Sequence, residues 1–251
     1  MHYSETAQSE KLYSRIAQSY ERVFERAILA EGKLASIVRR QMNGRSVLDL
    51  ACGNGRWLKR FSPAAYVGLD LNENLLDVAR REFPEHHFVR ADMSELPFAN
   101  GYFDGVVSLF GAMGHLPRQG QNKMLRETYR VLNARGIAIF TNGNMWSLFN
   151  LPTTLKANRV RIEGVRMRVH SSTPKSFRHC LEECGFEILE LSSYDFSYVP
   201  IMPLKFCVCL FGGDYREVYS GLMDVLENCN YIPTLRWLGK QLVAVCRKAH
   251  D

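Results

Sequence analysis

Short apolar runs alternate along the chain with segments whose apolar residues recur every three or four positions. The apolar runs are typical of buried strands and cover 46–50, 66–70, 87–91, 103–110 and 137–141. The segments between them, such as 74–82 and 121–132, have the spacing of amphipathic helices. Strands that alternate with helices predict crossover connections and therefore a parallel sheet.

Helix signals flank this alternation. Residues 25–42 predict a helix before the first strand, which an Asn-Gly pair ends. Residues 173–184 predict a helix that a Thr-Pro pair opens and a glycine closes, and strands are expected at 186–191 and 241–247. The pattern therefore predicts an α/β fold with a doubly wound, mostly parallel seven-stranded sheet.

The amino-acid composition is typical of a soluble globular protein, but it does not identify the function. With 46% hydrophobic and 23% charged residues, the chain has the balance of a soluble protein with a full core. No apolar run reaches the roughly 18 residues that span a bilayer, and the N-terminus lacks the apolar centre of a secretion signal. We therefore expect a cytoplasmic protein. A net charge of +6 suits an anionic partner or a merely basic surface.

The seven cysteines are an odd number without regular spacing, which indicates reduced thiols rather than a disulfide framework. Cys180 and Cys184 lie near His179, but a zinc site needs a third or fourth ligand at a recognisable spacing. We expect no metal site.

Glycine and acidic residues follow three successive predicted strands. The first strand leads into "VLDLACGNGRW", where Gly53 and Gly55 permit a close backbone approach. A dinucleotide fingerprint would place a third glycine at Leu58. The second strand ends at Asp70, and Asp92 follows the third. Carboxyl ends of parallel strands share one edge of the sheet, so these residues predict a ligand site there, with Asp70 able to accept from both hydroxyls of a ribose.

Four motifs carry a family resemblance: "VLDLACGNG", "GLDLNENLLDVAR", "RADMSELPFANGYFDGVVS" and "RETYRVLNARGIAIFT". Together they resemble the class I S-adenosylmethionine-dependent methyltransferases, closely over residues 12–141 and more loosely over 173–191. "YSRIAQSYE" is similar to the segment that folds over the cofactor in this family. An acidic residue commonly follows its first tyrosine, where this chain has Ser14.

The resemblance implies a Rossmann-like methyltransferase fold that binds S-adenosyl-L-methionine and releases S-adenosyl-L-homocysteine. It implies that the cofactor contacts Tyr13, Tyr20, Asp49, Ala51, Gly53, Asn54, Gly55, Asp70, Leu71, Asp92, Met93, Leu109 and Phe110. Asp49 and the glycine turn would face the methionine part, Asp70 the ribose and Asp92 with Met93 the adenine. Leu109 and Phe110 would lie near the sulfonium. Met93, Leu109 and Phe110 also suit a core role.

We expect a single domain of residues 1–251, since the chain is long enough for one large α/β domain with a full core. Residues 1–42 would form a helical lid, residues 43–141 the cofactor-binding half and residues 142–251 the substrate half. Insertions are expected at about 142–172 and 194–236, the second rich in aromatic and aliphatic side chains that could wall an acceptor pocket, form a dimer contact or rest on a membrane surface.

His115 is the candidate catalytic residue. The loop "SLFGAMGHLP" after the fourth strand directs it toward the expected methyl group, and histidine titrates near neutral pH. We hypothesise that it orients or deprotonates the acceptor. The alternative is that it caps the following segment or packs in the lid.

Alternation on both sides of Glu163-Gly164 predicts a hairpin over 159–168. Its register would place Arg161 opposite Arg166, and like charges in such pairs are unfavourable without an anionic ligand. Arg161 and Arg166 are therefore candidate substrate residues, together with Trp146 from the segment after the fifth strand. A solvated basic face is the alternative.

These observations lead to one expected function and two alternatives. We expect methyl transfer to an oxygen, nitrogen or carbon of a small or lipid-like metabolite, one that could carry an acidic group, by a monomer or homodimer. One alternative is a transfer-RNA-modifying methyltransferase, because the glycine turn is similar to such members and the hairpin could bind RNA phosphates. The other is a non-catalytic cofactor-binding partner or regulatory protein.

Overall fold

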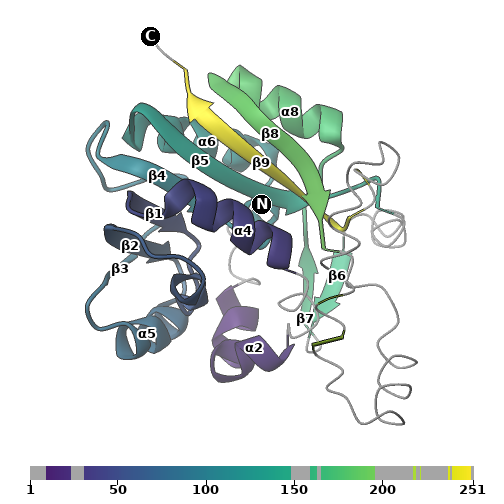
Figure 1. Ribbon diagram of the computed structural model, residues 1–251. Helices are drawn as coiled ribbons and strands as arrows, with labels where there is room; N and C mark the ends of the chain where they lie inside the picture. Colours follow the sequence, from purple (N-terminus) through teal and green to yellow (C-terminus); the bar gives the residue numbers. More distant parts are fainter. Residues whose placement is uncertain are drawn as a thin grey trace.

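The computed structural model describes residues 10–23, 31–147, 159–162, 165–195, 217–218, 221, 237 and 239–249. A central sheet organises the protein (Figure 1). Its strands are β1 (Ser46–Leu50), β2 (Ala65–Asp70), β3 (His87–Arg90), β4 (Phe103–Ser108), β5 (Leu132–Gly143), β8 (Phe186–Tyr194) and β9 (Gln241–Lys248). They lie in the order β3-β2-β1-β4-β5-β9-β8. Strands β1 to β5 are parallel, whereas β9 is antiparallel to both of its neighbours.

Two hydrophobic cores cover the two faces of the sheet, because successive residues of each strand point to opposite sides. Helices α4 (Gly32–Met42) and α5 (Glu73–Glu82) supply Leu34, Val38 and Leu76 to one core. Helices α6 (Arg118–Val131) and α8 (Pro174–Glu183) supply Leu125 and Phe177 to the other. The sheet is therefore doubly wound, as predicted.

Several smaller elements border this sheet. Residues 10–16 are helical and lead into η1 (Ala17–Ser19) and α2 (Tyr20–Val23). Two 3-10 turns follow strands: η2 (Arg56–Lys59) comes after β1, and η3 (Ala112–His115) comes after β4. Strands β6 (Arg159–Ile162) and β7 (Val165–Arg168) form a separate hairpin below the sheet in Figure 1.

Most predicted elements are confirmed, but several begin or end at other residues than predicted. Strand β4 ends at Ser108 instead of 110, and the segment after the glycine turn forms a single 3-10 turn. Strand β5 begins at Leu132, which was predicted to end a helix. Helix α4 begins at Gly32, and 24–30 lie outside the described residues, as does most of the insertion expected at about 194–236.

The chain reverses its direction of winding between β1 and β4. From β1 the strands proceed outward through β2 to β3, and β4 then returns to the other side of β1. Ligands of open α/β sheets bind outside the carboxyl ends of the strands at such a switch point. The topology therefore directs attention to the turns that follow β1, β2, β3 and β4.

Within the described ranges, no helix is long and apolar enough to cross a membrane. The same part of the chain holds no group of three His, Cys, Asp or Glu side chains placed to bind a metal ion. Cys52, Cys180, Cys184 and Cys246 are free thiols.

Candidate active site

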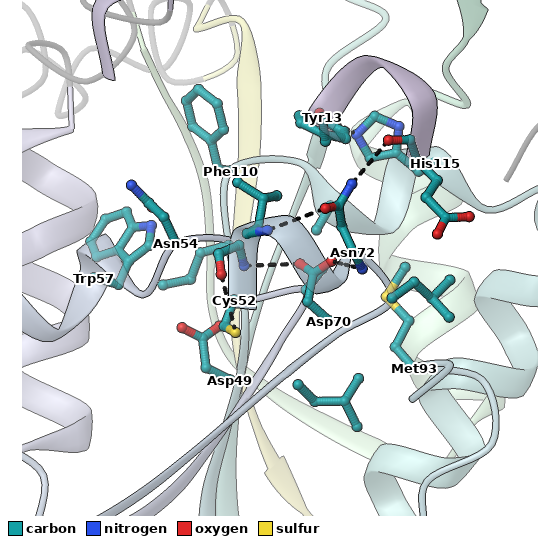
Figure 2. A pocket seen from close by; sticks show the side chains of 18 of the residues that line it. Tyr13, Asp49, Cys52, Asn54, Trp57, Asp70, Asn72, Met93, Phe110 and His115 are labelled. Carbon is teal, nitrogen blue, oxygen red and sulfur yellow. Dashed lines mark hydrogen bonds between the residues drawn. The ribbon is translucent and has the colours of Figure 1, made fainter. Parts of the chain in front are cut away.

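A pocket opens at the switch point, above the carboxyl ends of β1 to β4 (Figure 2). The predicted cofactor residues that line it are Tyr13, Tyr20, Asp49, Ala51, Gly53, Asn54, Asp70, Leu71, Asp92, Met93, Leu109 and Phe110, and His115 lines it as well. Gly55 does not line the pocket. Its φ is +74°, and a Cβ there would lie 3.2 Å from the Phe83 ring, so it serves the turn and its packing on α5.

Asp70, at the end of β2, is hydrogen-bonded to the turn that follows β1. Its Oδ2 accepts from the Gly53 N–H at 2.9 Å, and its Oδ1 accepts from the Asn72 N–H at 2.8 Å. Burial raises the pKa of Asp70, and these backbone N–H groups act in the opposite direction. Each oxygen of the Asp70 carboxylate can accept a further hydrogen bond. The two oxygens can therefore also accept from two neighbouring hydroxyls of a ligand.

Asp49 is buried beneath the glycine turn. The Tyr66 hydroxyl donates to its Oδ2 at 2.8 Å, and the residue is only 1% exposed. Burial raises the pKa of Asp49 to about 7, against the opposing effect of the Tyr66 hydrogen bond. A carboxyl group that titrates near neutrality in a pocket is typical of a functional site.

Two non-glycine residues with left-handed backbone line the pocket. Ala51 and Phe110 each have a φ of +57°, a conformation that side chains other than glycine rarely adopt. Gly111 follows Phe110 at +71°, and its N–H donates to Thr141 Oγ1 at 2.8 Å. Such strain persists where the surrounding structure holds it and clusters at functional sites. Here it turns the chain sharply after β1 and β4 and places both residues on the pocket wall.

Asp92 and Met93 form the third side of the pocket. The Asp92 Oδ1 accepts from the Ser94 N–H at 2.8 Å, which fixes the carboxylate at the turn after β3. Met93 is 8% exposed and packs in the core near Leu96 while it lines the pocket. Its core role and its position on the pocket wall therefore coexist.

Arg56 is a wall residue that sequence reasoning missed. Its guanidinium donates to Glu31 through two bonds of 2.6 Å, and both side chains are buried. It also lies 5.2 Å from the Trp57 ring centroid and 4.9 Å from that of Phe110. A hydrogen bond joins it to Tyr20 as well. Because Arg56 and Glu31 are 25 residues apart, no local pattern revealed this cluster.

Asn72 was also missed, although its position before a helix is a recognisable capping signal. Its Oδ1 accepts from the Leu75 N–H at 3.2 Å and caps α5. Its Nδ2 donates to the Glu10 carbonyl at 2.9 Å and to Ser14 Oγ at 3.0 Å. One side chain thus connects the β2 end to the helical segment at 10–16.

The N-terminal segment lies against the pocket. Leu12 and Ile16 are buried together, and Tyr13, Tyr20 and Val165 pack on them. Val165 belongs to β7, so the hairpin contacts this segment.

Tyr13 and His115 meet at one end of the pocket (Figure 2). The Tyr13 hydroxyl lies 3.0 Å from His115 Nε2, and the two rings meet edge to face at 5.5 Å. Burial lowers the pKa of His115 to about 4, so the imidazole is neutral near pH 7. Its buried Nδ1 has no hydrogen-bond partner in the described part of the chain.

Trp146 is the one predicted substrate residue whose side chain the structure describes. It is 53% exposed and does not line the pocket. The backbone register of β6 and β7 pairs Arg161 with Arg166 and Arg159 with Arg168, which confirms the predicted hairpin. The side chains of Arg161 and Arg166 lie outside the described part of the structure.

Comparison with known proteins also indicates a methyltransferase domain. Residues 47–136 match the family model described as a methyltransferase domain. The chain is 31% identical over 164 residues to an uncharacterised protein of Methanocaldococcus jannaschii, covering 65% of this chain and 63% of that one. It is 32% identical over 136 residues to the demethylmenaquinone methyltransferase of Thermotoga maritima, covering 50% of this chain and 57% of the relative. The chain thus spans about six tenths of the length of these relatives.

Solved structures share the fold along nearly the whole chain. A methyltransferase solved with the Trm112 activator of Haloferax volcanii superposes with a TM-score of 0.65 at 17% identity, covering 96% of each chain. An S-adenosylmethionine-dependent methyltransferase of Thermotoga maritima gives a TM-score of 0.64 at 14% identity, covering 95% of this chain and 99% of the other. The fold is therefore that of the class I methyltransferases. Residues 47–136 thus match a methyltransferase domain, and the chain has the fold of S-adenosylmethionine-dependent methyltransferases.

Proposed function

We propose that the protein transfers a methyl group from S-adenosyl-L-methionine to an oxygen, nitrogen or carbon atom of a small or lipid-like metabolite. One observation carries the proposal: the glycine turn, Asp70 and Asp92 follow three adjacent strands and line one pocket at the switch point. This arrangement suits a nucleoside, because carboxylates accept from ribose hydroxyls and from an exocyclic amine.

The residues present fit this cofactor. Asp70 would hold the ribose and Asp92 with Met93 the adenine, while Asp49 and the turn at Gly53 would face the methionine part. The backbone near Gly53 permits close approach, and Leu58 stands where a dinucleotide site would have its third glycine. When bound, the cofactor supplies the methyl group and leaves as S-adenosyl-L-homocysteine.

The protein's main contribution would be to hold the acceptor in line with the methyl group. Positioning of this kind can supply on the order of 7 to 11 kcal/mol of the barrier. Leu109 and Phe110 would wall the reaction space, and His115 would orient or deprotonate the acceptor. Trp146, Arg161 and Arg166 would receive the more distant part of the molecule, including any acidic group.

The relatives support a small-molecule acceptor. Several relatives that match at 32% to 33% identity are named demethylmenaquinone methyltransferases, a name that describes a quinone as their substrate. We propose a lipid-like or aromatic metabolite as the class of acceptor, without assigning that particular compound to this chain.

The test is incubation of the purified protein with cofactor that carries a labelled methyl group and with a size-fractionated cell extract. Label in a small-molecule or lipid fraction is the expected result. Label in RNA would replace this proposal with the transfer-RNA alternative. If titration calorimetry shows that the cofactor binds but no fraction gains label, the non-catalytic alternative is favoured instead.

A further inference from the structure

The contact between Tyr13 and His115 joins two parts of the chain that are 102 residues apart in sequence. Tyr13 comes from the helical segment at 10–16, and His115 ends η3 after β4. Their polar atoms are 3.0 Å apart, within hydrogen-bond distance. The hydroxyl of the N-terminal segment is therefore placed on the histidine of the reaction loop.

Chemistry favours one direction for the proton in this hydrogen bond. The phenol O–H is a good donor, and the unprotonated nitrogen of a neutral imidazole is a better acceptor than a phenol oxygen. Burial raises the pKa of Tyr13 well above its ordinary value, so the hydroxyl keeps its proton. The Tyr13 O–H then donates to Nε2, and a neutral imidazole carries its own proton on Nδ1.

The Nδ1 atom has no other role in the described structure. It is buried and has no hydrogen-bond partner among the described residues, while the ring lines the pocket. A buried polar atom left without a partner costs about 1 to 3 kcal/mol, so such atoms are rarely retained without a function. A molecule bound in the adjoining pocket can supply the missing partner.

We propose that His115 acts through Nδ1–H as a hydrogen-bond donor to an oxygen of the methyl acceptor, and that Tyr13 is the positioning residue that sets this tautomer. The acceptor then carries a carbonyl or an ionised oxygen at its reactive end. Because His115 has no free basic nitrogen in this state, it orients the acceptor and does not deprotonate it. This assignment rests on the proposed methyl transfer and narrows its substrate class.

The tautomer of His115 can be measured directly, in the absence of a methyl acceptor. In protein carrying ¹⁵N-labelled histidine, at pH 7 with S-adenosyl-L-homocysteine, we expect the His115 signals of a protonated Nδ1 and an unprotonated, hydrogen-bonded Nε2. Tyr13→Phe should redistribute the proton between the two nitrogens. A proton on Nε2 in the unmodified protein, or a charged ring at pH 7, would overturn the proposal, and neither reading requires the variant to fold.

A matched pair of variants tests the donor role in turnover. Asparagine at 115 keeps an N–H donor near the position of Nδ1, whereas glutamine moves it toward Nε2. With the extract fraction that accepts label, we expect His115→Asn to transfer methyl about tenfold faster than His115→Gln, the worth of one hydrogen bond. Equal, near-complete losses in both variants would indicate a base and contradict the donor role. Calorimetry with S-adenosyl-L-homocysteine separates this outcome from failure of the cofactor site itself.

Discussion

At the scale of one residue, burial of the Asp49 carboxyl group opposes folding. The group is buried next to Tyr66, and its pKa is raised to about 7. The unfolded value is about 3.9. A folded pKa above the unfolded one means that ionisation opposes folding, so this cost grows as pH rises from about 4 to about 7. A cationic ligand beside the carboxylate would offset it.

We therefore predict opposite effects of Asp49→Asn on stability and on binding. At pH 8 the ligand-free variant should be more stable than the original protein by up to about 4 kcal/mol, less any loss from its new amide, and the gain should shrink at pH 5. Its affinity for S-adenosyl-L-methionine at pH 8 should fall. Thermal denaturation at the two pH values and titration calorimetry measure these changes.

Asp77→Asn is the control, because this exposed carboxylate on α5 should change neither quantity by much. A pH-independent stability change in Asp49→Asn would show that Asp49 does not titrate as described.

Residues differ in how far the sequence could foretell their roles. Asp70 and Asp92 follow apolar runs, so the strand pattern alone places them at one edge of the sheet. Arg56 and His115 are different, since their partners come from distant segments and only the folded structure brings them together. The left-handed backbone of Phe110 has no sequence signal, because glycine would be the expected residue there.

At the scale of elements, the pair of Arg56 and Glu31 connects η2 to the start of α4. Its two 2.6 Å hydrogen bonds are buried. Removal of one partner would leave an uncompensated buried charge, which typically costs about 3 to 5 kcal/mol. We predict that Arg56→Met lowers the free energy of unfolding by this amount, as measured by urea denaturation.

The double variant Glu31→Leu with Arg56→Met should recover much of that loss, because it buries no lone charge. Arg40→Met, which breaks an exposed pair with Glu190, should cost less than about 1 kcal/mol. A loss in Arg56→Met no larger than in this control would contradict the role given to the buried pair.

The hairpin of β6 and β7 carries the second prediction at this scale. Its register places Arg161 opposite Arg166, a pairing of like charges that an anionic ligand would relieve. With both residues changed to Glu, we expect methyl transfer to the true acceptor to fall about tenfold or more while cofactor affinity is unchanged. Charge reversal at the exposed Arg39 and Arg118 is the control. If transfer also survives unchanged at the hairpin, its arginines face solvent only.

Element types were easier to predict from sequence than element ends. The capping box at Thr173, where the side chain accepts from the Ser176 N–H, made α8 predictable. Local patterns were less informative after β1, where only one 3-10 turn forms before the chain continues to β2. Leu132 has helical spacing but lies in β5, because pairing with β4 outweighs local preference there.

At the scale of the whole molecule, topology explains why the pocket exists. The strand order places the ends of β1, β2, β3 and β4 side by side, and the N-terminal segment lies against the pocket they form. The sequence predicted the doubly wound sheet and the edge at which the pocket lies. It could not predict the contact of Val165 with Leu12 and Ile16, which brings the hairpin to the N-terminal segment.

Titration calorimetry with S-adenosyl-L-homocysteine tests the proposed cofactor site most directly. We predict saturable binding of one molecule per chain, weakened at least about tenfold by Asp70→Asn, since a hydrogen bond to a charged group contributes about 1.5 to 3 kcal/mol. Asp77→Asn should bind as the original protein does. Folded protein that shows no saturable binding, or equal affinity in Asp70→Asn, would contradict the assignment of this pocket.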